Sequence, residues 1–326
     1  MKIIYKLLFL FLLTIGYSSC DFLDIVPDEI TTEADAFKDR NAAKNFVYSC
    51  YGYLPQSNVA SGSLDLLTGD EVITAFEHET FASFPKGNYT ASSPVISYWN
   101  TFFQGLRQCY IFLENVDKVP DLTESVKTDY IAQVKFLIAY YHYQLARCYG
   151  PIILIKELPD VNASQAEYLP RTSYDECVDW ICNLLDEAAS SLPAIRTNKE
   201  DYGLATSVGA KAVKAKMLLY AASPLFNGNS SFYSNFTDKS GSQLMPLTYD
   251  PNKWVKAKTA IKEAIDLAEQ NGHALYVKQD YKIGNEDANP YPAAGPVRCL
   301  RTSLVDWDSR NPEVLLAETR SEGSYG

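Results

Sequence analysis

The stretch that decides the fold runs Phe136-Leu-Ile-Ala-Tyr-Tyr-His-Tyr-Gln-Leu-Ala-Arg-Cys-Tyr-Gly150-Pro151. Across it and the residues before it, apolar side chains recur every three or four positions, at 126, 130, 134, 137, 138, 141, 145 and 148. This spacing lines one face of an α-helix. Gly150 and Pro151 then end the pattern, since glycine closes helices and proline cannot continue them. We therefore predict a long helix from about Leu122 to Tyr149.

Helical patterns also flank this stretch on both sides. Each begins near a residue that can cap or open a helix and ends near proline, glycine or asparagine. The five further predicted helices run from Glu33 to about Tyr53, from about Ser97 to Val116, from Ser173 to about Ser191, from Thr206 or Ser207 to Ala222, and from Pro251 to Asn271. Between them, the short apolar run Ile152–Ile155 predicts a strand or an extended segment.

Six helices in paired order with little strand indicate an all-α protein. Helix pairs over this length predict a tetratricopeptide-like helical-pair scaffold. The repeat period is not clean, because three long irregular segments interrupt the helices, at 55–96, 223–250 and 273–312. Loops of that length in a compact protein are usually functional, so binding residues are expected there.

The composition excludes one class of partner. The chain has 326 residues and a net charge of −11, and its length suits one large domain or two smaller ones. Such an acidic surface would repel phosphate backbones, which argues against nucleic acid as a partner. The 23 Tyr, 15 Phe and 4 Trp are unusual. Tyrosine suits both helix packing and stacking on sugars, and packing accounts for most of these residues.

The first twenty residues have the order of a secretory signal. Lys2 and Lys6 are followed by the apolar run Leu7–Ile15 and then by small residues up to Cys20. The run is too short to cross a bilayer. A cysteine in this place is where bacterial lipoproteins carry their acyl chains, so we predict lipidation of Cys20 and a membrane anchor. Such signals usually have Leu where this chain has Tyr17, and an ordinary signal peptide is the alternative.

The remaining cysteines and histidines predict no catalytic or metal site. None of the seven cysteines forms a C-x-x-C pair or a zinc-like cluster, so we expect mostly free, buried thiols, with a disulfide between distant helices left open. No hydrolase, metalloprotease, phosphate-loop or calcium-loop signature occurs, and no cofactor is implied. Glu77 and Glu79 could be a carboxylate pair of the kind that glycosidases use, but solvated acids are the simpler interpretation.

Several segments together resemble one family. Cys20-Asp-Phe-Leu-Asp-Ile-Val-Pro, the segment Tyr98–Asn115, the stretch from Phe136 to Leu154, Pro170–Glu176 and Lys211–Ala222 all resemble motifs of the SusD-like (RagB/SusD) lipoproteins of Bacteroidetes, in the same order. On this resemblance, residues 1–19 are a lipoprotein signal peptide, 20–310 are the helical N-terminal region, and 311–326 are the start of an incomplete C-terminal region. The chain is therefore expected to be truncated.

The resemblance implies a function in nutrient uptake. Family members lie on the outer membrane, bind glycans or peptides, and deliver them to a SusC-like, TonB-dependent transporter. Asp21 and Asp24, just after Cys20, resemble the acidic signal that sends such lipoproteins to the cell exterior. A surface glycoside hydrolase and a tetratricopeptide-type protein scaffold remain alternative hypotheses.

Five residues are candidates for ligand contact. Phe76 ends a segment similar to one that carries a glycan-stacking aromatic in the family, and His78 and Glu79 follow it. A flat ring can pack on the apolar face of a sugar while polar neighbours bind its hydroxyls. Tyr291 and Trp307 lie in the late irregular region, from which the family also draws ligand contacts. For Phe76 and Trp307, packing in the core or over a helix end is an equal alternative.

Overall fold

The fold is a stack of long helices. The computed structural model describes residues 33–55, 75–78, 80–160, 162–164, 169–276 and 311–319. Its main helices are α3 (Arg40–Tyr51), α5 (Trp99–Asn115), α6 (Glu124–Tyr149), α7 (Tyr174–Ser191), α8 (Ser207–Ala222) and α10 (Asn252–Gln270). The shorter elements are α2 (Glu33–Ala36), η3 (Thr80–Ser83), η4 (Val116–Lys118), η6 (Lys199–Asp201) and α9 (Ser230–Tyr233).

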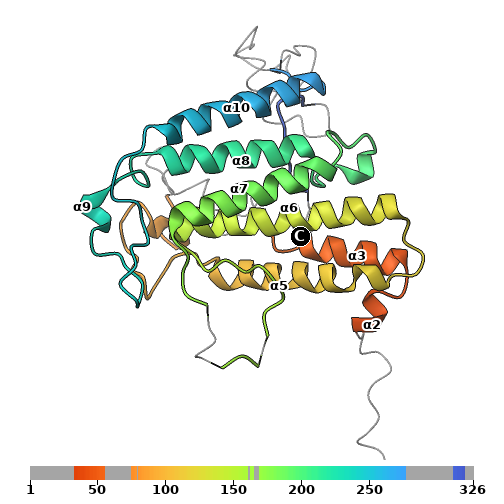
Figure 1. The fold of residues 1–326 in the computed structure, drawn as a ribbon, viewed down its shortest axis with the longest axis horizontal. Helices are drawn as coiled ribbons and strands as arrows, with labels where there is room; N and C mark the ends of the chain where they lie inside the picture. The colour runs from red at the N-terminus through yellow and green to blue at the C-terminus, as the bar shows by residue number, and fades with distance from the viewer. Residues whose placement is uncertain are drawn as a thin grey trace, which may run out of the picture.

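The helices lie side by side in layers, as Figure 1 shows. α10 packs on α8, α8 on α7, α7 on α6, and α5 and α3 cover the opposite side of α6. No strand occurs among the described residues, where only two isolated bridges are found, Thr90 with Ser93 and Thr237 with Gln243. The predicted all-α architecture of paired helices is confirmed.

The helix predicted from the deciding stretch is α6, and it forms the centre of the molecule. It begins two residues later than predicted, after Thr123, whose side chain accepts a bond from the Val126 N–H. It ends at Gly150, which has a φ of 71° and so adopts a conformation that suits glycine. Residues on nearly all its sides are buried between positions 132 and 146. A helix that is apolar all round belongs in a core.

The packing of α5 against α6 requires a small residue. An added Cβ at Gly105 would lie 2.9 Å from Tyr53 Cβ and 3.0 Å from the Tyr141 ring. Tyr141 is fully buried, stacks on Phe102 at 5.7 Å, and donates its hydroxyl proton to the carbonyl of Cys50. Gly105 therefore sets the close approach that lets one tyrosine join α3, α5 and α6.

The prediction of one helix from Glu33 to about Tyr53 was wrong. The chain breaks between α2 and α3, and Asp39 adopts an extended conformation and caps α3 by accepting from the Ala42 N–H at 2.8 Å. Aspartate favours such cap positions over helix interiors because its short side chain bonds the free N–H groups. The break turns Phe37 back against Phe46, with ring centroids 4.8 Å apart.

The segment after α6 forms neither a helix nor a strand, so the predicted alternative of a strand is wrong. Ile152 and Leu154 are buried. The Ile155 N–H donates to His142 Nε2 at 3.1 Å, while His142 Nδ1 donates to the Ile138 carbonyl at 2.8 Å. His142 is therefore neutral and fixes this segment to the side of α6.

The described cysteines agree with the prediction of mostly free, buried thiols. Cys50, Cys109, Cys148, Cys177 and Cys182 are all free thiols, and Cys20 and Cys299 lie outside the described residues. Burial raises the pKa of Cys177 to about 11 and that of Cys182 to about 12, which keeps both as inert thiols at neutral pH. None of the described helices is long and apolar enough to cross a membrane.

Candidate functional site

The predicted ligand-binding segment can be described in part. Phe76 is 63% exposed, and its ring lies beside that of His78, with centroids 5.8 Å apart. Both residues belong to the connection that leads into η3 and α5. The alternative that Phe76 packs in the core is wrong for this structure. Much of the Phe76 side chain therefore faces solvent.

The other candidates in the sequence cannot be placed. Glu79, Tyr291, Trp307 and the lipidation site Cys20 all lie outside the described residues. Glu77 is exposed and pairs with Lys86 at 3.5 Å, which fits a solvated acid. No cluster of His, Cys, Asp and Glu that could hold a metal ion occurs in the described part of the chain.

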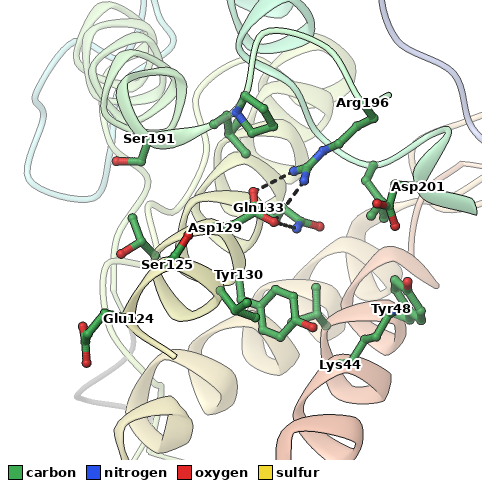
Figure 2. Close-up of a pocket in the computed structure, with 16 residues that line it drawn as sticks. Lys44, Tyr48, Glu124, Ser125, Asp129, Tyr130, Gln133, Ser191, Arg196 and Asp201 are labelled. Atoms are coloured by element: carbon green, nitrogen blue, oxygen red, sulfur yellow. Dashed lines mark hydrogen bonds and ion pairs between the residues drawn. The ribbon is translucent and has the colours of Figure 1, made fainter. Parts of the chain in front are cut away.

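A groove that the sequence did not predict lies at the end of the bundle where α6 begins. Its volume is about 790 Å³, within the range of about 300–1,000 Å³ typical of ligand sites. α3 contributes Lys44 and Tyr48, and the first turns of α6 contribute Asp129 and Tyr130. The connection after α7 closes it with Arg196, and Figure 2 shows the polar side chains of these segments around one space. Neither Phe76 nor His78 lines this groove.

One hydrogen-bond network forms a wall of the groove. Arg196 donates to both carboxylate oxygens of Asp129, Nη2 to Oδ1 at 2.8 Å and Nη1 to Oδ2 at 3.0 Å. Arg196 also donates to the Ala205 carbonyl through Nε at 3.1 Å and through Nη2 at 2.9 Å. Bidentate pairs of this kind fix geometry more strictly than single bonds do.

The network continues into the core through two more residues. Gln133 donates to Asp129 Oδ2 at 2.7 Å and accepts from the Tyr51 hydroxyl at 3.0 Å. That hydroxyl in turn accepts from the Ala205 N–H at 2.9 Å. Burial raises the pKa of Tyr51 far above its usual value, so it remains a hydrogen-bond donor. The groove therefore has a rigid wall anchored to α3, α6 and the 192–206 connection.

Two tyrosines supply aromatic surface in the groove. Tyr48 is 38% exposed, and the Lys44 ammonium lies 5.5 Å from the centroid of its ring. A hydrogen bond with Tyr48 raises the pKa of Lys44. Tyr130 packs edge-on against Phe112 at 6.5 Å, and burial raises the pKa of its hydroxyl. At neutral pH the groove therefore presents the charged ammonium of Lys44 and the neutral phenol of Tyr130.

Several aromatic residues pack together in the second half of α6 and beside its end. The Trp99 ring meets Tyr149 edge-on at 5.2 Å, and the Arg171 guanidinium lies 5.2 Å from the Trp99 centroid. Tyr141 and Tyr143 are almost fully buried. These rings pack within the bundle, and Trp99 and Tyr149 remain partly exposed.

A family profile described as starch-binding and associating with the outer membrane, of SusD-like type, matches residues 21–219. This is more than half of the chain. The chain belongs to the SusD-like family. Proteins of this family bind carbohydrate at the cell surface, and the predicted resemblance is confirmed.

Individual relatives agree with this assignment. SusD-like protein P25 of Formosa agariphila is 23% identical over 230 residues, which are 67% of this chain and 43% of that protein. The solved structure of BT4246 is 36% identical with a TM-score of 0.69, over 75% of this chain and 42% of the other. A SusD-like protein of Bacteroides fragilis, BF3747, matches at 23% identity and a TM-score of 0.55, over 77% and 42% of the two chains. The chain spans about two fifths of the length of these relatives.

Proposed function

We propose that this SusD-like chain is a lipid-anchored protein of the outer membrane that binds oligosaccharides and passes them to a SusC-like, TonB-dependent transporter. The observation that carries the proposal is the family match over residues 21–219. The lipid would be attached at Cys20, and the resemblance of Asp21 and Asp24 to an export signal favours the outer face of the membrane. An acidic protein of charge −11 also fits a carbohydrate ligand better than a polyanionic one.

Phe76 is our candidate for the sugar-stacking residue. Its ring is largely exposed, and the neighbouring His78 imidazole could bond a hydroxyl of the same sugar. A ring that faces solvent gains most when a sugar's C–H face covers it, because apolar surface leaves water on both partners. Glu79, Tyr291 and Trp307 complete the proposed set of contacts.

Calorimetric titration of the full chain and of Phe76→Ala tests this assignment. Loss of the stacking ring should weaken oligosaccharide binding by about 1–3 kcal/mol, by analogy with other stacking contacts. Phe232→Ala is a matched control, because Phe232 is also a highly exposed phenylalanine, in α9. Equal affinities for Phe76→Ala and the unsubstituted chain would show that the ring takes no part in binding.

The anchor and the partner need separate measurements. The Cys20→Ala chain should leave the membrane fraction, whereas the unsubstituted chain should stay in it until detergent is added. Purification of the anchored chain from cross-linked outer membranes should bring with it a TonB-dependent transporter. Recovery of soluble proteins alone would instead favour a protein-binding scaffold.

A further inference from the structure

We propose that the groove between α3, the start of α6 and the 192–206 connection is a second carbohydrate site, which takes a neutral sugar unit. The inference rests on the proposed function, because it assumes that oligosaccharides are the ligands of the protein. It adds a site that lies apart from Phe76 and that is built from helix residues.

The lining combines hydroxyls, rings and charges of both signs. Its hydroxyl groups belong to Tyr48, Ser125, Thr128, Tyr130 and Ser191. Its charged groups are Lys44 and Arg196 against Glu124, Asp129 and Asp201. A polyanion would face three carboxylates, and a cation would face an ammonium and a guanidinium. A neutral polyhydroxyl ligand can accept from the cations and donate to the carboxylates.

The aromatic surface gives the groove an apolar component. The rings of Tyr48 and Tyr130 come from different helices, and both line the same space (Figure 2). The Lys44 ammonium lies over the Tyr48 ring, and the Phe112 ring packs edge-on against the Tyr130 ring. Rings with polar groups beside them are the surfaces that suit the C–H faces and hydroxyls of sugars.

The polar groups are already in place before a ligand arrives. Asp129 accepts three bonds, two from Arg196 and one from Gln133. Arg196 uses four of the five N–H groups of its guanidinium in the bonds to Asp129 and Ala205. The remaining N–H belongs to Nη1, on a side chain that lines the groove. A preformed donor costs little conformational entropy on binding, which favours affinity.

Titration of the full chain with maltoheptaose, laminarihexaose, cellohexaose and mannohexaose tests the proposal, with four variants. These are Tyr48→Ala, Tyr130→Phe, Phe76→Ala and the control Tyr249→Ala, which removes an exposed tyrosine that does not line the groove. Tyr130→Phe removes only a hydroxyl and keeps the packing on Phe112. Urea unfolding of each variant checks that it is folded.

We expect at least one of these oligosaccharides to bind with two components. Tyr48→Ala should weaken one of them about tenfold, within the range known for loss of a stacking ring, and Tyr130→Phe should weaken the same component less. Phe76→Ala should leave that component unchanged, and so should Tyr249→Ala. If Phe76→Ala leaves both components unchanged while Tyr48→Ala and Tyr130→Phe weaken one of them, the groove is supported and the proposed role of Phe76 is wrong.

Three results would overturn the inference. If Phe76→Ala removes all binding while Tyr48→Ala and Tyr130→Phe change nothing, the second site does not exist and the proposed function stands. If none of the four sugars binds the unsubstituted chain, both proposals fail together. Binding of a peptide in the groove, lost in Tyr48→Ala, without sugar binding would also contradict the carbohydrate assignment.

Discussion

The two ends of α6 each hold an arginine in place by a different chemistry. At the start of the helix, Arg196 forms a bidentate ion pair with Asp129. At its end, Arg171 lies over the Trp99 ring and donates to the carbonyls of Pro151 at 2.6 Å and Tyr149 at 3.3 Å. Arg196 is therefore held by a carboxylate together with the Ala205 carbonyl, and Arg171 by an aromatic face together with two backbone carbonyls.

The difference teaches how each end can respond to change. The side chains of Arg196 and Asp129 are only 12% and 26% exposed, so loss of one partner leaves a poorly solvated charge. The contacts of Arg171 are several and individually weak. A single substitution should therefore destabilise the protein more at the start of α6, beside the groove, than at the end of α6, around Arg171.

The largest effect is expected for Asp129→Ala. It removes three hydrogen bonds and leaves Arg196 without its counter-charge, which should lower the free energy of unfolding by about 3 kcal/mol. Asp266→Ala is the matched control, because Asp266 pairs with Lys262 on the exposed side of α10 and should cost only about 0.5 kcal/mol. Urea unfolding measures both. Equal losses of unfolding free energy in the two variants would contradict the expectation that the buried ion pair stabilises the fold more than the exposed one.

A smaller loss of stability is expected from acid, through His142 in the second half of α6. Burial lowers the pKa of His142 to about 4, below the usual value of about 6.5 for the unfolded chain. The unfolded chain then binds more protons, so the stability contributed by neutral His142 is full above pH 6.5 and is lost as the pH falls toward 4. By pH 5 the loss should be about 2 kcal/mol.

Unfolding in urea from pH 7 to pH 5 measures this dependence. The His142→Gln chain is the control, because glutamine does not titrate and should flatten the slope over that range. Since His142 Nε2 accepts from the Ile155 N–H, the protection of the Ile155 amide against hydrogen exchange, relative to its intrinsic rate at each pH, should fall with acid. An identical slope in both chains would assign the acid sensitivity to other groups.

The smallest effect is expected for Arg171→Lys, at about 1 kcal/mol. Lysine keeps the charge but loses the flat guanidinium that covers Trp99 and reaches two carbonyls. The same change at Arg196 should cost more, because it breaks a bidentate pair. Thermal unfolding compares the two variants, and a larger loss at Arg171 would reverse the ranking of the two ends.

The long helices could be predicted from the sequence because their signals are local. The caps Thr123 and Thr206 and the terminator Gly150 act within four residues of the helix ends. The break at Asp39 was missed because apolar spacing continues across it, and only the side-chain bond to Ala42 reveals it. Local periodicity thus predicts that a helix exists better than it predicts where one divides.

The groove could not be predicted because its parts are far apart in the chain. Asp129 and Arg196 are 67 residues apart, and Tyr51 and Ala205 are 154 apart. Nothing in the sequence near Arg196 indicates a carboxylate partner. Phe76 was found only through the family resemblance, since a lone aromatic in a loop carries no periodic signal.

The central claim is that this chain binds carbohydrate. Calorimetric titration of the full chain against matched panels of oligosaccharides and peptides tests it most directly. Our account predicts saturable binding to at least one oligosaccharide and none to the peptides. Binding to peptides alone would contradict it, and so would a folded chain that binds no member of either panel.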